Sequence, residues 1–142
     1  MQVSFAIRPY ALTFLKKMAK KWEIVIFTAS HQDYANAILD ELDPDGIIFS
    51  HRLYRQHCTI INDMYVKDLS RINRKRKDTV LVDNAAYSYC MQLSNGIPIL
   101  PFYDGKDYEL SALESYLEKL YCCEDVRQMN AEYFQLHRYT EF

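Results

Sequence analysis

Residues Glu23–Ser30, EIVIFTAS, place a run of apolar and mostly β-branched residues directly before three small ones. A run of this kind predicts a strand that is buried on both faces. Apolar residues at helical spacing flank it, at Tyr10–Lys21 before it and at His31–Leu42 after it, with Ser30 as the expected N-cap of the second helix. A helix, a strand and a helix joined by short links predict an α/β fold, with a mainly parallel sheet and helices on both faces.

The alternation of helix and strand patterns continues to the end of the chain. Further strands are expected at Ile47–Phe49, Cys58–Ile61, Met64–Val66, Thr79–Val82 and Ile97–Leu100, and residues 52–66 are otherwise irregular in pattern. Further helical segments are expected at Asp68–Asn73 (one turn), Glu109–Leu120 and Asp125–His137. No linker, repeat or low-complexity tract interrupts the pattern, which predicts a single domain over residues 1–142.

The composition is that of an ordinary globular chain, with 49% hydrophobic and 25% charged residues. A net charge of −2 gives no general electrostatic reason to expect nucleic acid or an anionic membrane as a partner. The four cysteines form no C-x-x-C pair, so we expect a reduced intracellular chain, nuclear or cytoplasmic, without a structural metal. The start lacks the apolar stretch of a signal peptide and no apolar run reaches about 18 residues, so we expect no membrane segment.

Polar side chains follow two of the expected core strands, at the edge where open α/β sheets hold their sites. Thr28, after EIVIF, offers a hydroxyl at a helix start, which suits a phosphate group. Asp83 and Asn84, after TVLV, offer oxygen ligands for Mg²⁺ or its waters, and Lys67 offers a cation for a phosphoryl oxygen. Each also has an ordinary structural interpretation: a helix cap for Thr28, a solvated side chain for Lys67 and a turn for Asp83–Asn84.

Much longer stretches of the chain match one known family. They are IRPY, FLKKM, EIVIFTAS, LDPDGIIFSHRLYRQHC, YVKDLSRINR, VLVDNAAYSY, QLSNGIPI and EDVR. Together, in this order, they resemble the C-terminal-domain (CTD) small phosphatases and Dullard-like protein phosphatases of the haloacid dehalogenase superfamily, and most of all the small-phosphatase-like branch. The resemblance covers nearly the whole chain and implies a Rossmann-like, haloacid-dehalogenase-like fold.

The resemblance also implies a role for each candidate residue. Thr28 would hold the transferred phosphoryl group, and Lys67 would balance the charge of a phosphoaspartate. Asp83 would bind Mg²⁺, and Asn84 would order the water around the metal. The implied reaction is the two-step hydrolysis of phosphoserine or phosphothreonine through an aspartyl phosphate.

Two further residues match positions at which the family contacts its phosphorylated protein substrate, such as the tail of RNA polymerase II. They are Tyr34, after FTAS, and Arg55, in the LYR segment. The planar fork of an arginine suits a phosphate better than a lysine does. Tyr34 can equally be a core residue on the face of its helix.

One family motif has no counterpart in the chain. The Asp-x-Asp run that carries the nucleophile and the general acid would precede Arg8–Pro9, and Asp43–Pro44–Asp45 follows a helix, not a strand. We therefore expect the 142 residues alone to be inactive and to lack the central strand of the sheet, so that the strands ending at Thr28 and Asp83 each have an open edge. A truncated domain, a non-catalytic homologue and completion by another chain are the three explanations. A smaller departure is Ala85–Ala86, where relatives usually have Ser-Pro.

Two other functions compete with the phosphatase. The mitochondrial inner-membrane import receptor uses the same domain as a non-catalytic binding module, although FTAS and the Asp83–Asn84 pair favour the phosphatase. The basic run Arg71–Lys77, RINRKRK, would suit nucleic acid or a nuclear localisation signal, or it is a solvated turn. Aromatic residues are not interleaved with this run, which argues against base stacking.

Overall fold

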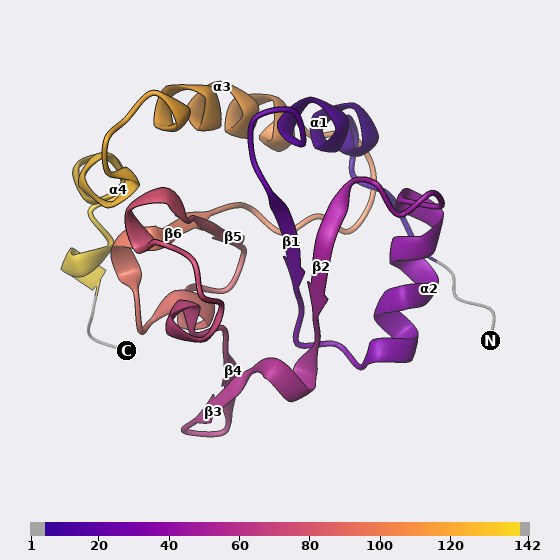
Figure 1. The fold of residues 1–142 in the computed structure, drawn as a ribbon, viewed down its shortest axis with the longest axis horizontal. Coiled ribbons are helices and arrows are strands. Elements are labelled where there is room, and N and C mark those ends of the chain that lie inside the picture. Colours follow the sequence, from indigo (N-terminus) through magenta and orange to yellow (C-terminus); the bar gives the residue numbers. More distant parts are fainter. Residues whose placement is uncertain (1–4, 140–142) are drawn as a thin grey trace. The chain divides into compact units, whose positions relative to one another are not determined.

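The computed structural model describes residues 5–139, and the outermost residues of the predicted domain, 1–4 and 140–142, lie outside this range (Figure 1). The chain divides into two compact units. In the described range the first unit comprises residues 5–58 and 102–115, and the second comprises residues 59–101 and 116–139. The single-domain organisation stays a prediction.

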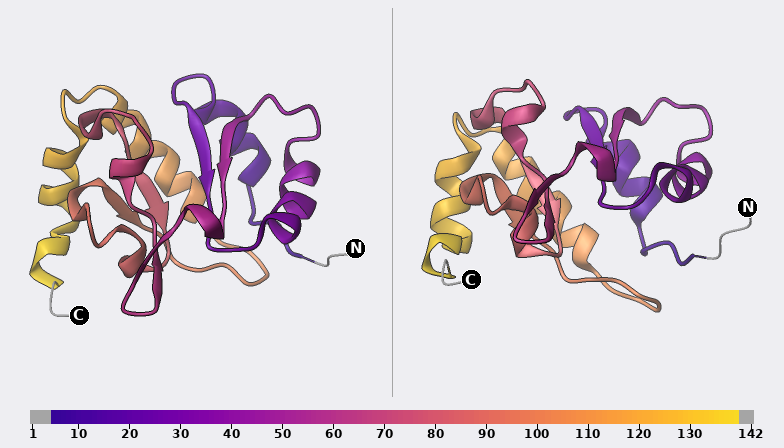
Figure 2. Two further views of the ribbon diagram at one scale, coloured as in Figure 1. Left: turned by 60° about the horizontal axis from the view of Figure 1, so that its bottom comes forward. Right: turned by 90° about the horizontal axis from the view of Figure 1, so that it is seen from below.

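The first unit is built on a parallel pair of strands. The strands β1 (Ile24–Phe27) and β2 (Phe49–Leu53) lie side by side, with Phe27 opposite Leu53. The helices α1 (Ala11–Met18) and α2 (Gln32–Leu42) precede and follow β1, and α2 lies beside the pair in every view of Figures 1 and 2.

Apolar side chains from α2, from β2 and from the residues on either side of β2 form a core cluster of this unit. The buried members are Ala35, Leu39, Ile48, Phe49 and Tyr54, and the half-buried Leu15, Ile24, Ile26 and Leu42 pack against them. The spacing of 35, 39 and 42 puts one face of α2 on the strands, which is why its period was readable from the sequence.

The second unit contains a hairpin and a second parallel pair. The strands β3 (Thr59–Ile61) and β4 (Met64–Val66) are antiparallel, and Asn62 and Asp63 between them both have positive φ, 49° and 62°, as a tight hairpin turn requires. The strands β5 (Leu81–Asp83) and β6 (Gly96–Pro98) are parallel.

Helical segments complete this unit. Short 3-10 helices occupy Leu69–Arg71, Arg76–Asp78, Ala86–Tyr89, Leu93–Asn95 and Leu136–Tyr139. The helix α4 spans Val126–Phe134, and α3 (Glu109–Tyr121) runs from the first unit into the second. The predicted fold class, α/β with parallel strands and helices, is confirmed.

Tyr89 is the most buried aromatic side chain of the second unit, at 1% exposure. Its ring lies so close to Gly96 that a Cβ there would come within 2.3 Å of ring carbon Cδ2, although the backbone at Gly96 (φ −83°) would suit any residue. Burial raises the pKa of the Tyr89 hydroxyl, and the charge of Asp83 raises it further. Position 96 therefore excludes side chains because of packing and not because of conformation.

Some predicted boundaries were wrong for physical reasons. Residues 47 and 48 precede β2, which instead continues through the exposed Ser50 and His51. The N-cap of α2 is His31 and not Ser30, whose N–H donates to Thr28 Oγ1. The last long helix ends at Phe134, because Gln135 adopts a left-handed conformation, φ 53°.

Among the described residues, no helix combines the length and the apolar content that crossing a membrane requires.

The carboxylate of Asp43 explains the late start of β2. This side chain is 3% exposed, and its oxygens accept hydrogen bonds of 3.0 Å from the backbone N–H groups of Ile47, Ile48 and Phe49. Burial alone would raise the pKa of Asp43, but these three hydrogen bonds, aided by the charge of Arg52, lower it. Residues 47 and 48 are thus held in a turn around a charged carboxylate.

Replacing this carboxylate should destabilise the first unit. We expect Asp43→Ala to lower the free energy of unfolding by about 3 kcal/mol, since hydrogen bonds to a charged group contribute about 1.5–3 kcal/mol each and the N–H groups of Ile48 and Phe49 stay buried. Because the folded pKa of Asp43 is lowered, its contribution is complete above its ordinary value of 3.8 and is lost as the pH falls through the folded value. Urea titrations at several pH values measure this, with the exposed Asp45→Ala as control. Equal stability of the two variants at pH 7 would contradict it.

Candidate functional site

Thr28 lies one residue beyond the end of β1. Its N–H donates to the carbonyl of Leu53 at 2.9 Å, which extends the parallel ladder past the strand. Its hydroxyl accepts the N–H of Ser30 at 3.0 Å. This contact forms a local turn and is not the helix cap of the ordinary interpretation, because α2 has His31 as its N-cap and no side-chain cap. A hydroxyl that accepts one hydrogen bond still has its own proton to donate.

A small cavity of about 170 Å³ opens beside Thr28. Its lining combines apolar and hydroxyl side chains from β1 and α2: Ile26, Thr28, Ser30, Tyr34, Ala35, Ile38 and Leu39. Tyr34 is 46% exposed at this cavity, so it is not the core residue that its helical spacing also allowed. The first unit thus places Tyr34 and Thr28 on one cavity wall.

Arg55 is fixed to the loop that follows Thr28. Its Nε donates to the carbonyl of Ala29 at 2.6 Å, and its backbone N–H donates to the carbonyl of Ser30 at 3.1 Å. Its Nη1 lies 2.9 Å from His31 Nε2, which must act as the acceptor because a guanidinium has only donors. The first unit therefore brings together three of the predicted residues, Thr28, Tyr34 and Arg55.

In the second unit Lys67 and Asp83 form a buried ion pair. They follow β4 and end β5, their side chains are 11% and 8% exposed, and Lys67 Nζ contacts Asp83 Oδ2. The other oxygen of Asp83 accepts the N–H of Ala85 at 2.9 Å. Lys67 is thus not a solvated surface side chain, whereas Asp83 does make the turn contact that the ordinary interpretation expected. Asn84, next in the chain, is exposed.

Gln92 holds the segment around Lys67 and was not singled out from the sequence. Its Oε1 accepts the N–H of Leu69 at 3.0 Å, and its Nε2 donates to Asp68 Oδ1 at 2.8 Å. The backbone N–H of Lys67 itself donates to the carbonyl of Ser88 at 2.8 Å. A lone glutamine has no periodic signal, and the match of the whole stretch QLSNGIPI to the family gave no reason to single out this residue.

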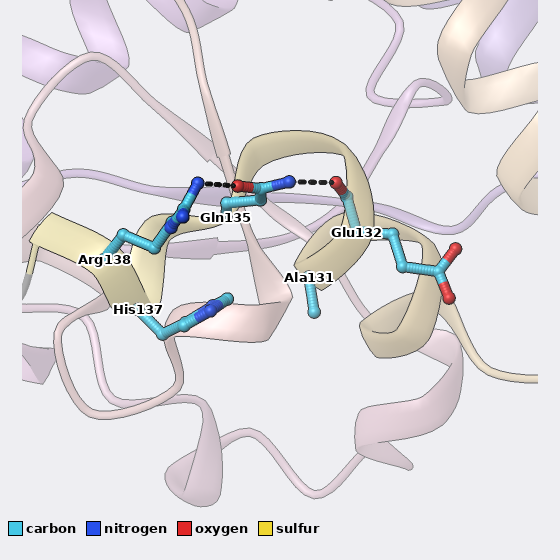
Figure 3. A pocket seen from close by; sticks show the side chains of 5 residues that line it. All are labelled: Ala131, Glu132, Gln135, His137 and Arg138. Atoms are coloured by element: carbon cyan, nitrogen blue, oxygen red, sulfur yellow. Dashed lines mark hydrogen bonds between the residues drawn. The ribbon is translucent and has the colours of Figure 1, made fainter.

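No group of three or more His, Cys, Asp or Glu side chains within residues 5–138 is placed to hold a metal ion. A shallow hollow of about 470 Å³ lies at the end of α4, where Figure 3 shows Arg138 bonded to Gln135, and its lining contains none of the predicted site residues.

Comparison with known proteins bears on what these residues do. The family model described as NLI interacting factor-like phosphatase matches residues 1–127. The chain belongs to this family of protein phosphatases. It is 43% identical to CTD small phosphatase-like protein 3 of Caenorhabditis elegans, over 99% of the chain and 50% of that relative. It is 40% identical to carboxy-terminal domain RNA polymerase II polypeptide A small phosphatase 2 of Homo sapiens, over 88% of the chain and 46% of that relative.

The fold of this phosphatase family is also found among solved structures. The fission yeast RNA polymerase II CTD phosphatase Fcp1, bound to beryllium fluoride, aligns with a TM-score of 0.60 and 20% identity, over 94% of the chain and 40% of that protein. At this identity the likeness concerns the fold, which agrees with the predicted haloacid-dehalogenase-like class. The chain spans about half the length of the two curated relatives. The resemblance inferred from the sequence motifs is confirmed.

Loss of the Gln92 amide should loosen the Lys67 segment without unfolding the unit. We expect Gln92→Met, which keeps the side-chain length, to speed hydrogen exchange at the Leu69 amide at least tenfold and to lower the free energy of unfolding by about 1–2 kcal/mol, since two hydrogen bonds are lost. The exposed Gln128→Met is the matched control. Hydrogen exchange followed by NMR checks this. Unchanged exchange at Leu69 in a folded variant would show that the hydrogen bonds of Gln92 do not stabilise the Lys67 segment.

Proposed function

We propose that the chain is most of the catalytic domain of a Mg²⁺-dependent protein serine/threonine phosphatase, whose nucleophilic aspartate comes from outside residues 1–142. The observation that carries this proposal is the buried pair of Lys67 and Asp83 at the ends of β4 and β5. The phosphorylated protein on which the domain acts is of the class named for its relatives, such as the tail of RNA polymerase II. A nuclear or cytoplasmic location is part of the same proposal.

The pair would supply the positive charge that phosphoryl transfer needs. A cation held away from water interacts strongly with charge that develops on a phosphoryl oxygen, because little solvent has to reorganise. Removal from water is costly for both ions, and the contact between Lys67 and Asp83 offsets part of that cost. Lys67 would move its contact from Asp83 toward the phosphoryl group of the aspartyl phosphate.

The residues that follow β5 fit a magnesium ligand set. Mg²⁺ is usually bound by one or two carboxylates, with waters and substrate phosphate completing the shell. Asp83 supplies one carboxylate, and the exposed amide of Asn84 is next to it to order a water. When bound, Mg²⁺ would offset negative charge on the phosphoryl oxygens.

In this proposal the first unit would supply the contacts to the phosphate and to the substrate. Thr28 would donate its hydroxyl proton to a phosphoryl oxygen, with its oxygen oriented by the N–H of Ser30. Arg55, held in place by the carbonyl of Ala29, would contact the phosphoserine, and Tyr34 would contact the peptide beside it. Beryllium fluoride, the anion in the Fcp1 structure, resembles a phosphoryl group in size and charge.

The nucleophile is the part that the described residues do not supply. The one Asp-x-Asp run of the sequence is Asp43–Pro44–Asp45, and both oxygens of Asp43 are engaged by backbone N–H groups. Within residues 5–139, β1 pairs only with β2 and β5 only with β6, so each has a second edge to which a strand can add. We propose that an aspartate-bearing strand from outside residues 1–142 adds to one of these open edges.

Activity should therefore depend on adding the missing motif. We expect the 142 residues alone not to hydrolyse p-nitrophenyl phosphate, and the same chain extended by the first-motif segment of a relative to do so with Mg²⁺. In the extended chain, Lys67→Ala and Asp83→Ala should each lower kcat by 10²–10³-fold, as the loss of one electrostatic donor does, while the exposed Lys106→Ala should not.

Two outcomes would contradict this proposal. Mg²⁺-dependent turnover by the 142 residues alone would mean that they contain the nucleophile. A folded extended chain without turnover would favour the alternative, a non-catalytic binding module of the same fold such as that of the mitochondrial import receptor.

Arg55 should affect the binding of a peptide substrate more than the chemical step. In the extended chain we expect Arg55→Ala to raise KM for a phosphoserine peptide about tenfold and to change kcat/KM for p-nitrophenyl phosphate much less, because the small substrate has no peptide to orient. Gln56→Ala, beside it on the same short helix, is the control. Steady-state kinetics on both substrates measures the difference, and equal losses on the two would show that Arg55 does not contact the peptide side.

A further inference from the structure

The basic run Arg71–Lys77 is not used by the proposed reaction. Its five cationic side chains, Arg71, Arg74, Lys75, Arg76 and Lys77, are all on exposed residues, and Asp78 is the one acid that adjoins them in the chain. We call these five residues the basic surface. Its sequence suited a nuclear localisation signal, a nucleic-acid contact or a solvated turn.

The backbone of the basic surface is held in a folded shape. Asn95, which is 1% exposed, donates through Nδ2 to the carbonyls of Arg76 at 2.7 Å and Thr79 at 2.8 Å. The carbonyl of Lys75 accepts from the Thr79 hydroxyl at 2.8 Å and from the N–H of Asp78 at 3.0 Å. A linear signal read in extended form would break these bonds and leave the Asn95 amide buried without them. The run is therefore better suited to act as a fixed surface.

The basic surface lies close to the Lys67 segment. Arg71 is four residues after Lys67, so their Cα atoms are at most about 14 Å apart even in a fully extended chain. Burial tends to raise the pKa of Asp68, but hydrogen bonds from Gln92 and Ser70 and the nearby charge of Arg76 together lower it. The charge of Arg76 therefore acts on the residue next to Lys67.

Charge and composition favour a short anionic peptide over nucleic acid. Lys77 Nζ lies 3.6 Å from Asp78 Oδ2, so an acid borders the cations on this unit, and the chain as a whole is negative. A nucleic-acid site usually neutralises about 6–10 phosphates and stacks bases on aromatic rings. Five cations without interleaved aromatic residues instead match one or two phosphate groups, which arginine binds through paired N–H donors.

We propose that the basic surface binds a second phosphate group of the protein segment whose phosphoserine enters the Lys67–Asp83 site. The proposal rests on the phosphatase function and specifies its substrate class as multiply phosphorylated segments. The second phosphate adds binding energy and takes no part in the chemical step, so it should act on KM and on Kd and leave the rate of the reaction itself unchanged.

Binding to the 142-residue chain tests the proposal without needing turnover. The probes are one fluorescein-labelled peptide with no phosphoserine, with one, and with two phosphoserines four residues apart, and a single-stranded RNA of 12 nucleotides. We expect the doubly phosphorylated peptide to bind at least tenfold more tightly than the singly phosphorylated one by fluorescence anisotropy at low salt, and the difference to shrink as salt is added. The double variant Lys75→Glu/Arg76→Glu should abolish the difference.

A matched double variant distinguishes the effect of the basic surface from the effect of net charge. Lys16→Glu/Lys20→Glu, on exposed residues at α1, makes the same change in charge and should preserve the preference for two phosphates. Equal losses in both double variants, or no loss in either, would overturn the proposal. Tighter binding of the RNA than of the peptide, lost only in Lys75→Glu/Arg76→Glu, would make this a nucleic-acid surface instead.

Kinetics of the extended chain distinguishes this proposal from the function on which it rests. Lys75→Glu/Arg76→Glu should raise KM at least fivefold for the doubly phosphorylated peptide and leave kcat on p-nitrophenyl phosphate unchanged. If the extended chain proves inactive while the binding difference persists, the phosphatase function is contradicted, but binding of a second phosphate by the basic surface is supported. If turnover is normal and KM does not differ between the peptides, the proposed role of the basic surface is contradicted and the phosphatase function is not.

Discussion

Two opposite charges that are both removed from water are the constraint on which the second unit depends. Lys67 and Asp83 have side chains only 11% and 8% exposed, and each would be costly to bury without the other. Their positions are set by different chain segments, β4 and β5, which must therefore end side by side for the pair to form. The hydrogen bond from the Lys67 N–H to Ser88 and the Gln92 amide fix the β4 end of this arrangement.

The pairing of parallel strands sets the positions of the candidate residues in each unit. Thr28 and Asp83 each follow or end a strand whose neighbour runs parallel to it, and in each case the ladder continues past the strand end, through Thr28 N–H to Leu53 and through Ile99 N–H to Asp83. Parallel ladders align the carboxyl ends of strands, so polar residues that lie far apart in the sequence gather at one edge of each pair. The positions of Thr28 and Asp83 thus depend on where two short strands stop.

Local pattern predicted most of the fold because helices and buried strands have clear periods. It failed at β2, where Asp43 gathers three backbone N–H groups and delays the strand, since a carboxylate in a turn has no periodic signal. The burial of Lys67 was equally unreadable, because it depends on a partner 16 residues away. The roles of Thr28 and Arg55 came from the motif match, and the geometry adds the loop that ties these two residues together.

The segment from Gln92 to Gly96 takes part in four separate contacts within the second unit. Gln92 clamps the Lys67 segment, the carbonyl of Ser94 accepts from Asn130 on α4 at 3.0 Å, Asn95 holds the basic surface, and Gly96 makes room for the ring of Tyr89. Substitutions that share partners and backbone shifts do not add independently. Evolution of this segment is therefore expected to be epistatic: a change at one of its positions is tolerated only where compensating changes have already occurred at the contacts of the others.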